Sequence, residues 1–142
     1  MSYQNVKINP LIFDIIIFIV RLFVGFAMLS HGFPKLQTLI EGGNIEFFDF
    51  FGLGSKVTLV LTGFAEFVCS IFLVLGLFTR FAAGFLIITM VIAAFVVLGT
   101  EAFDKKELSL LYLAIYAIIT TFGAGAISVD YLIEKRRRAS EW

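Results

Sequence analysis

The segment LIFDIIIFIVRLFVGFAMLSHGF, residues 11–33, decides the fold class of this chain. It is an apolar run that contains Asp14 and Arg21 and ends before Pro34, and it is longer than the roughly 20 residues that a helix needs to cross a bilayer. Lys7 is the only basic side chain before it and Arg21 lies inside it, so the segment lacks the pattern of a cleaved signal peptide. We therefore predict a transmembrane helix that is retained in the protein.

The composition of the whole chain is that of a membrane protein. Of its 142 residues, 60% are hydrophobic and 15% are charged, with a mean hydropathy of +0.99, whereas a soluble domain has about 25% charged residues. Apolar runs over residues 57–78, 81–99 and 108–126 predict further spans. Because the spans, their loops and the tails use the whole chain, we predict a single all-α membrane domain over residues 1–142, a bundle of four transmembrane helices.

The segments outside the spans have signatures of their own. Residues 44–51, NIEFFDFF, are rich in aromatic side chains but too short to span, so they predict a short interfacial helix between the first and second spans. Residues 132–142 are predicted to form a basic tail. An even number of spans puts both termini on the side of Arg80 and residues 135–138. Since this side has more cations than the other, we predict that both termini are cytoplasmic.

The composition also argues against several partners and cofactors. Eleven basic and eleven acidic side chains give no net charge, which disfavours a nucleic-acid partner. The single cysteine, Cys69, cannot form an internal disulfide, and the single histidine, His31, cannot supply both axial ligands of a bis-histidine haem. We therefore predict no metal site in the chain and a lipid bilayer as its first partner.

Two opposite charges are predicted at the same depth in the membrane. Arg21 lies about 15 Å into the first predicted span and Glu66 about 14 Å into the second, at 1.5 Å per residue. Because consecutive spans run in opposite directions, both should lie near the middle of the bilayer, where an isolated charge costs about 2.5–3.5 kcal/mol. We predict a buried ion pair between Arg21 and Glu66, which either locks the two helices together or lines a path for a ligand or a proton.

Polar and small residues recur at helical spacing along three of the predicted spans. Those of the first span form one seam, on which two glycines permit close approach of another helix: Asp14, Phe18, Arg21, Gly25, Met28, Gly32 and Lys35. The second and fourth spans carry stripes of their own: Thr58, Thr62, Glu66 and Ser70, and Ser109, Tyr112, Tyr116 and Thr120. We predict that these stripes face inward, either as interhelical contacts or as the lining of a pocket.

A polar mouth is predicted above the charge pair, at the outer end of the bundle. Its members are His31, Lys35, Glu107, Tyr112 and Tyr116. Such a mouth can bind a quinone head group, whose carbonyls accept hydrogen bonds and whose reduction needs protons from titratable neighbours. His31, Glu107 and Tyr112 are therefore the candidate catalytic residues. The alternative is that His31 is only a hydrogen-bonded or snorkelling residue at the membrane interface.

Several motifs, in their order and spacing, resemble the DoxX family of small bacterial membrane proteins. They cover roughly residues 11–132 and comprise Arg21 with Gly25, HGFPK at 31–35, Glu66, GLFTRFAA at 76–83, ELSLLY at 107–112 and GAGAISVD at 123–130. The resemblance implies a four-helix protein of the bacterial inner membrane. It places the family's polar signature on these residues: Arg21, His31, Lys35, Glu66, Glu107 and Asp130. Of the motif residues, Arg80 and Asp130 are expected on the cytoplasmic side.

The resemblance also leads to three functional hypotheses. Members of the family are described as subunits of a terminal quinol oxidase or of a thiosulfate:quinone oxidoreductase, so the first hypothesis is a quinone-binding or non-catalytic subunit of a membrane oxidoreductase. It implies quinone as the cofactor, a redox protein as the partner, and a second copy of the chain as a further candidate partner. The second is a structural or assembly scaffold with a buried charge network, and the third is a carrier of protons or small solutes.

Overall fold

The structure is a computed structural model that describes residues 8–49 and 52–141 of the chain. These residues are all-α, as predicted, and contain no strand. The helices are α1 (Pro10–Glu41), α2 (Ser55–Leu75), α3 (Thr79–Val91), the π-helix η1 (Ile92–Val97), α4 (Phe103–Phe122) and α5 (Val129–Ser140). Helix η1 continues α3, so the two make one rod, Thr79–Val97.

Three helical segments are long and apolar enough to cross a membrane: α1, α2 and the α3–η1 rod. Helix α4 has 20 residues, but its first turns are charged, from Asp104 to Glu107. Its apolar part, residues 108–122, is about 22 Å long at 1.5 Å per residue. The fourth transmembrane crossing therefore stays a prediction.

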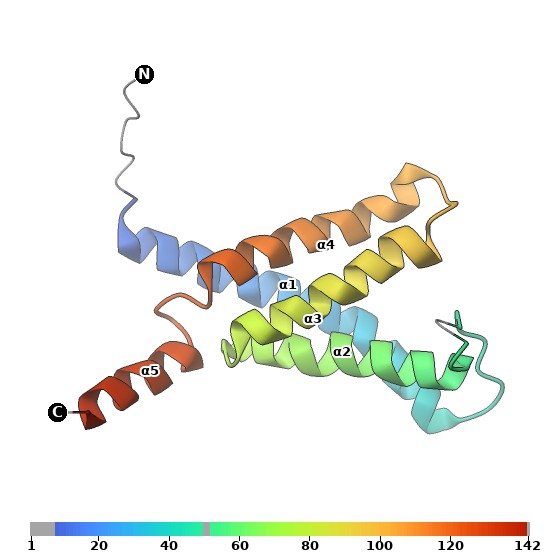
Figure 1. Cartoon of the computed structure of the whole chain (residues 1–142), viewed down its shortest axis with the longest axis horizontal. Coiled ribbons are helices and arrows are strands. Elements are labelled where there is room, and N and C mark those ends of the chain that lie inside the picture. Colours follow the sequence, from blue (N-terminus) through green and yellow to red (C-terminus); the bar gives the residue numbers. More distant parts are fainter. Residues whose placement is uncertain (1–7, 50–51, 142) are drawn as a thin grey trace, which may run out of the picture.

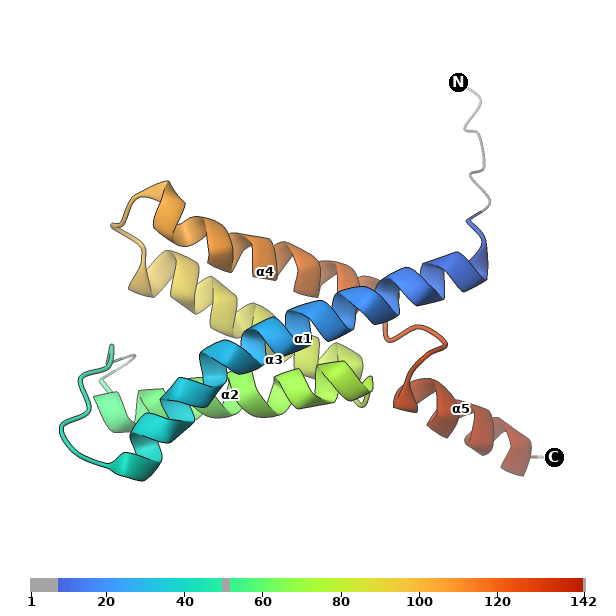
Figure 2. The same ribbon diagram turned by 180° about the vertical axis from the view of Figure 1, so that it is seen from behind.

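The long helices pair as two antiparallel hairpins. Helix α1 packs along α2, the α3–η1 rod packs along α4, and a short turn joins α2 to α3. Figures 1 and 2 show that the two hairpins cross and diverge from each other. We call the end with the α2–α3 turn, the start of α1 and the end of α4 the turn end, and the opposite end the loop end. Fully buried side chains fill the core between the helices, among them Val24, Met28, Leu73, Leu86 and Tyr116.

Two glycines set the contact between α1 and α2. A β-carbon added to Gly25 would lie 2.4 Å from Cγ2 of Val74, and one added to Gly32 would lie 2.9 Å from the backbone nitrogen of Phe67. Both glycines belong to the seam predicted on the first span, and they are buried. The central part of the seam therefore faces α2, and its glycines bring the two backbones into contact.

Helix α1 runs through Pro34 and ends at Glu41, so the prediction that Pro34 ends this helix is wrong. A proline inside a membrane helix is tolerated where neighbouring groups compensate for its missing N–H. The helix ends instead at Gly42, which has a φ of 68°. Glycine adopts this backbone conformation without the steric cost that other residues incur.

The interfacial helix predicted for residues 44–51 is also wrong for the residues that the structure describes. Residues 44–49 have no helical structure, and residues 50–51 lie outside the described chain. The segment leaves α1 through two glycines at positive φ, and the Asp49 carboxylate accepts a hydrogen bond from the Gly54 N–H at 2.9 Å. Because a helix of this length has too few internal hydrogen bonds to offset nucleation, a loop results.

The predicted basic tail contains a helix, α5. The Ser128 hydroxyl caps it by accepting a hydrogen bond from the Tyr131 N–H at 3.2 Å. Asp130 lies in its first turn, and Arg137 and Arg138 lie in its last turn, where each charge complements the helix dipole. This serine followed by an acidic residue is a helix start signal that the sequence analysis did not use.

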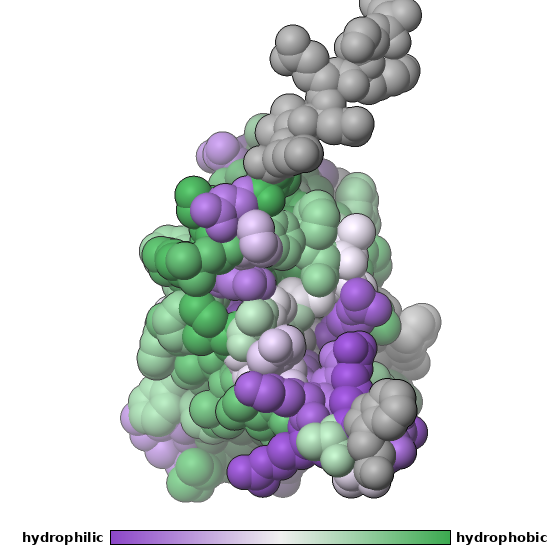
Figure 3. All heavy atoms as spheres, turned by 90° about the vertical axis from the view of Figure 1, so that its left-hand side faces the viewer, coloured by the Kyte–Doolittle hydropathy of each residue, from purple (hydrophilic) through white to green (hydrophobic). Residues whose placement is uncertain are grey.

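The flanks of the bundle expose large apolar side chains. More than half of the surface of several phenylalanines is exposed: Phe23, Phe26, Phe64, Phe81 and Phe95. Figure 3, which views the turn end, shows hydrophobic residues over much of the surface and hydrophilic residues gathered toward one side. Monomeric soluble proteins rarely expose such continuous apolar surface, so these flanks suit a lipid bilayer.

Candidate functional site

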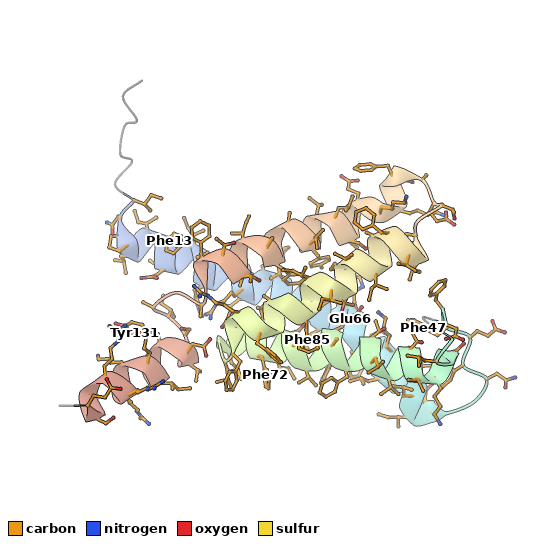
Figure 4. All side chains as sticks on the ribbon, viewed as in Figure 1. Phe13, Phe47, Glu66, Phe72, Phe85 and Tyr131 are labelled. Atoms are coloured by element: carbon orange, nitrogen blue, oxygen red, sulfur yellow. The ribbon has the colours of Figure 1, made fainter. Side chains whose placement is uncertain are left out.

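A partly buried ion pair joins α1 to α2. Nζ of Lys35 lies 2.5 Å from both carboxylate oxygens of Glu66, and the Glu66 side chain is only 5% exposed. The ring of Phe47, from the loop after α1, lies 5.9 Å from the same ammonium group. Figure 4 shows Glu66 within the bundle and Phe47 toward the loop end. The midspan carboxylate of α2 thus has a cationic partner on the α1 seam, and it is a lysine.

The predicted ion pair between Arg21 and Glu66 is wrong. Arg21 is fully buried, and its Nη2 donates a hydrogen bond to the backbone carbonyl of Ile127 at 2.6 Å. Gly32 lies against Glu66, and Arg21 precedes Gly32 by 11 residues, which places it about 16 Å further along the helix axis. The prediction assumed that the two spans begin at the same depth, whereas α1 extends beyond the end of α2 at the turn end (Figure 2).

The guanidinium of Arg21 fills a closely fitted space. Its Nε and Nη1 have no hydrogen-bond partner within the described residues, and its Cζ lies 5.8 Å from the centroid of the Phe18 ring. A β-carbon added to Gly76 would lie 1.9 Å from Nη1, so a residue larger than glycine would displace the guanidinium. The negative charge of Asp130 acts on Arg21.

Asp130 closes the turn between α2 and α3. Its two carboxylate oxygens accept hydrogen bonds from the N–H groups of Phe78 at 2.8 Å and Thr79 at 2.9 Å. Its own N–H donates to the Gly76 carbonyl at 2.8 Å. A carboxylate at the N-terminus of a helix is stabilised by the helix dipole. Asp130 therefore fixes the start of α3 and brings α5 to the turn end, where Arg80 also lies.

The connector between α4 and α5, residues 123–128, is held by two charged residues of α1. Asp14 Oδ1 accepts a hydrogen bond from the Ala126 N–H at 2.9 Å, and Arg21 donates to the carbonyl of the next residue, Ile127. The connector leaves α4 at Gly123, which has a φ of 85°. These residues belong to the GAGAISVD motif, whose contacts with the charges of the first helix have no signal in the sequence.

An aromatic ladder of His31, Tyr112 and Tyr116 connects α1 to α4. The ring of His31 meets that of Tyr112 edge to face, with centroids 6.1 Å apart, and Tyr112 stacks on Tyr116 at 5.9 Å. Exposure falls along the ladder, from the exposed His31 to Tyr112 at 8% and Tyr116 at 0%. The Tyr116 hydroxyl has no hydrogen-bond partner among the described residues.

The residues predicted for the polar mouth are thus divided between two groups. His31, Tyr112 and Tyr116 form the ladder, and Lys35 pairs with Glu66. Glu107 is exposed and forms no hydrogen bond or ion pair with the described part of the chain. A cavity of about 170 Å³ at the loop end is lined by Lys35 and Phe47, without His31 or Glu107.

A larger cavity, of about 600 Å³, lies at the turn end. It is lined by the start of α3, the connector and the first part of α5, and it includes Arg80 and Asp130. Among residues 8–49 and 52–141, no group of histidine, cysteine, aspartate or glutamate side chains is placed to hold a metal ion.

The fold and these contacts define a class of protein: a small all-helical membrane protein in which buried charges join its helices and its connector. The sequence profile of the DoxX family matches residues 16–99. The chain belongs to the DoxX family, which confirms the resemblance seen in its motifs. An uncharacterized protein of Haemophilus influenzae is 32% identical over 120 residues, which cover 78% of this chain and 84% of that protein. No solved structure matches the chain significantly.

Proposed function

We propose that this DoxX-family protein is a membrane subunit that supports quinone-linked redox chemistry together with a partner protein. In this proposal a quinone head group binds beside the aromatic ladder, where the α1–α2 and α3–α4 hairpins diverge. The observation that carries the proposal is the ladder itself, which runs from an exposed histidine to a fully buried tyrosine hydroxyl that has no partner among the described residues. A buried polar group that lacks a partner within the chain is a candidate for binding a ligand or water.

The chemistry of the ladder fits a quinone. A quinone takes up protons when it is reduced, and histidine is the side chain whose charge changes most readily near neutral pH. His31 is exposed and can exchange protons with its surroundings. Tyr112 can donate a hydrogen bond to a quinone carbonyl, and Tyr116 lies within electrostatic range of Glu66. The ladder and the Lys35–Glu66 pair together form a polar route through an apolar bundle.

Quinone binding tests this function directly. Purified protein in detergent is dialysed to equilibrium against a short-chain ubiquinone analogue, and the Kd is compared among variants. We expect His31→Ala and Tyr112→Phe each to weaken binding about tenfold, the effect of losing one good hydrogen bond to a ligand. Tyr131→Phe on α5 removes a tyrosine hydroxyl outside the ladder and is the matched control. If the wild type binds no quinone, or the ladder variants bind as it does, the ladder is not a quinone site.

A structural scaffold is the second candidate function, and the buried charges favour it. Lys35 and Glu66 join α1 to α2, and Arg21 and Asp14 join α1 to the connector. Charged side chains that are paired in this way hold helices together without taking part in a reaction. A scaffold would bind no quinone in the dialysis experiment, so the same measurement separates the two functions.

We further propose that the protein lies in the bacterial inner membrane with both termini in the cytoplasm. Arg80 and the cations of α5 lie at the turn end, where α1 also begins, which supports this orientation by the positive-inside rule. In a Cys69→Ala background, a single cysteine at Thr100 should react with a membrane-impermeant maleimide in intact spheroplasts. A cysteine at Ser140 should react only after permeabilisation, and the reverse pattern would contradict the orientation.

A further inference from the structure

The cavity at the turn end is separate from the aromatic ladder and from the Lys35–Glu66 pair. The α2–α3 turn lies between two predicted spans, so the cavity beside it lies where those spans meet the membrane surface. Its volume of about 600 Å³ is large enough for a small polar group together with the first atoms of its substituents. Nothing in the proposed quinone chemistry uses this cavity.

The cavity contains donors for an anion that the chain itself leaves unused. Thr79 lines it and is 1% exposed, yet its buried Oγ1 has no hydrogen-bond partner among the described residues. Arg80 lines it too, is exposed, and forms no ion pair with the described part of the chain. Both residues lie in the first turn of α3, where the helix dipole favours a negative charge. The N–H groups of Phe78 and Thr79 already donate to Asp130.

The carboxylates in the lining already have partners within the chain. Asp130 accepts hydrogen bonds from two backbone N–H groups at the start of α3, and the charge of Arg21 acts on it. Glu134 forms an ion pair with Arg138 one turn further along α5. Arg80 is therefore the charged residue of the lining that has no ion-pair or hydrogen-bond partner among the described residues.

The rim of the cavity is aromatic and exposed. The exposed fractions are 62% for Phe78, 66% for Phe81 and 56% for Phe122. Exposed aromatic rings at the end of membrane spans contact the upper part of lipid acyl chains. An anion site within such a rim suits an amphiphile, because its charged group and its hydrocarbon chains are bound by adjacent surfaces.

We propose that this cavity binds the phosphate group of an anionic phospholipid. The guanidinium of Arg80 and the hydroxyl of Thr79 bind the phosphate oxygens, since guanidinium groups match phosphate geometry. The acyl chains lie against the rings of Phe78, Phe81 and Phe122. Bound there, the lipid contacts α3 and the connector at once.

Native mass spectrometry of protein purified in a maltoside detergent tests this proposal, with phosphatidylglycerol as the added probe. We expect a saturable lipid adduct on the wild type, and at least about tenfold weaker binding for Arg80→Ala and Thr79→Val, because each removes a hydrogen bond to a charged group. Arg136→Ala, which removes a cation of the same end outside the cavity lining, should change the Kd less than twofold.

Thr79→Val separates a ligand role from a structural one. Valine has the shape of threonine, and the lost hydroxyl bonds nothing within the described chain, so the lipid-free protein should unfold at the same temperature or a higher one. Weaker lipid binding without loss of stability supports the site. Unchanged lipid binding by Thr79→Val would overturn it. Displacement of the lipid by millimolar glycerol phosphate would also overturn it, because the site would then recognise a free phosphate rather than a lipid.

Discussion

Replacing Gly32 by alanine should separate the two helices of the α1–α2 hairpin. The added β-carbon would lie 2.9 Å from the Phe67 nitrogen and 3.1 Å from the Glu66 carbonyl carbon, both backbone atoms, whereas ordinary contact begins at 3.4 Å. The helices must therefore move apart by about 0.5 Å, and such overpacking costs about 1–3 kcal/mol. Alanine regains about 0.5–1 kcal/mol from its better helix propensity. We expect a net loss of about 0–2.5 kcal/mol in the free energy of unfolding.

Gly84→Ala in α3 is the matched control, because a β-carbon there would meet nothing within 4 Å. In this variant the free energy of unfolding should rise by about 0.5–1 kcal/mol, from the better helix propensity of alanine alone. The assay is reversible unfolding of purified protein in mixed micelles with increasing sodium dodecyl sulfate, followed by circular dichroism. The free energies of unfolding of the two variants should differ by the overpacking cost of about 1–3 kcal/mol, with Gly32→Ala the less stable. Equal stabilities would refute the close contact between the α1 and α2 backbones.

Two double-mutant cycles and two single variants probe the charges and the turn end in the same unfolding assay. A double-mutant cycle between Lys35 and Glu66 should give a coupling energy of about 1–3 kcal/mol, and a cycle between Arg21 and Glu66 should give a coupling energy near zero. The opposite ranking would support the Arg21–Glu66 ion pair that the sequence predicted. Asp130→Ala should lower the free energy of unfolding by about 0.5–2 kcal/mol, as the loss of a helix cap does, and should speed hydrogen exchange of the first amides of α3. Unchanged exchange would show that the carboxylate does not cap this helix. Gly76→Ala should lower the free energy of unfolding by more than about 2 kcal/mol, since alanine is strained in the left-handed backbone conformation of this position and its β-carbon would meet a buried guanidinium. A variant as stable as the wild type would contradict the close fit.

The sequence was sufficient to predict the long helices and the inward face of the central part of α1, because both depend on local periodicity. Apolar runs of sufficient length predicted the three helical segments that are long and apolar enough to cross a membrane, and spacings of three and four residues predicted the seam that carries Gly25 and Gly32. The predicted partner of Glu66 was wrong because the pairing of two side chains depends on the register of one helix along the other. The register between the helices is set by the fit of glycines against the facing backbone. Counting residues from the start of each span does not reveal this fit.

The contacts of the connector could not be predicted from the spacing of residues. Asp14 and Arg21 were placed on the seam of the first span, yet their partners are backbone groups of Ala126 and Ile127, more than 100 residues later. Backbone donors and acceptors have no sequence signature, so a pairing rule based on opposite charges overlooks them. Helix α5, in contrast, was predictable from the cap at Ser128 and was missed because the basic residues were interpreted as a tail.

The connector that binds Asp14 and Arg21 follows them by more than 100 residues, so it is synthesised after the first helix. The first helix therefore enters the membrane carrying charges whose partners have not yet been made. A chain that stops before residue 126 leaves these two charged side chains without their connector partners. The same contacts that join the first helix to the connector thus distinguish a chain that includes the connector from one that lacks it.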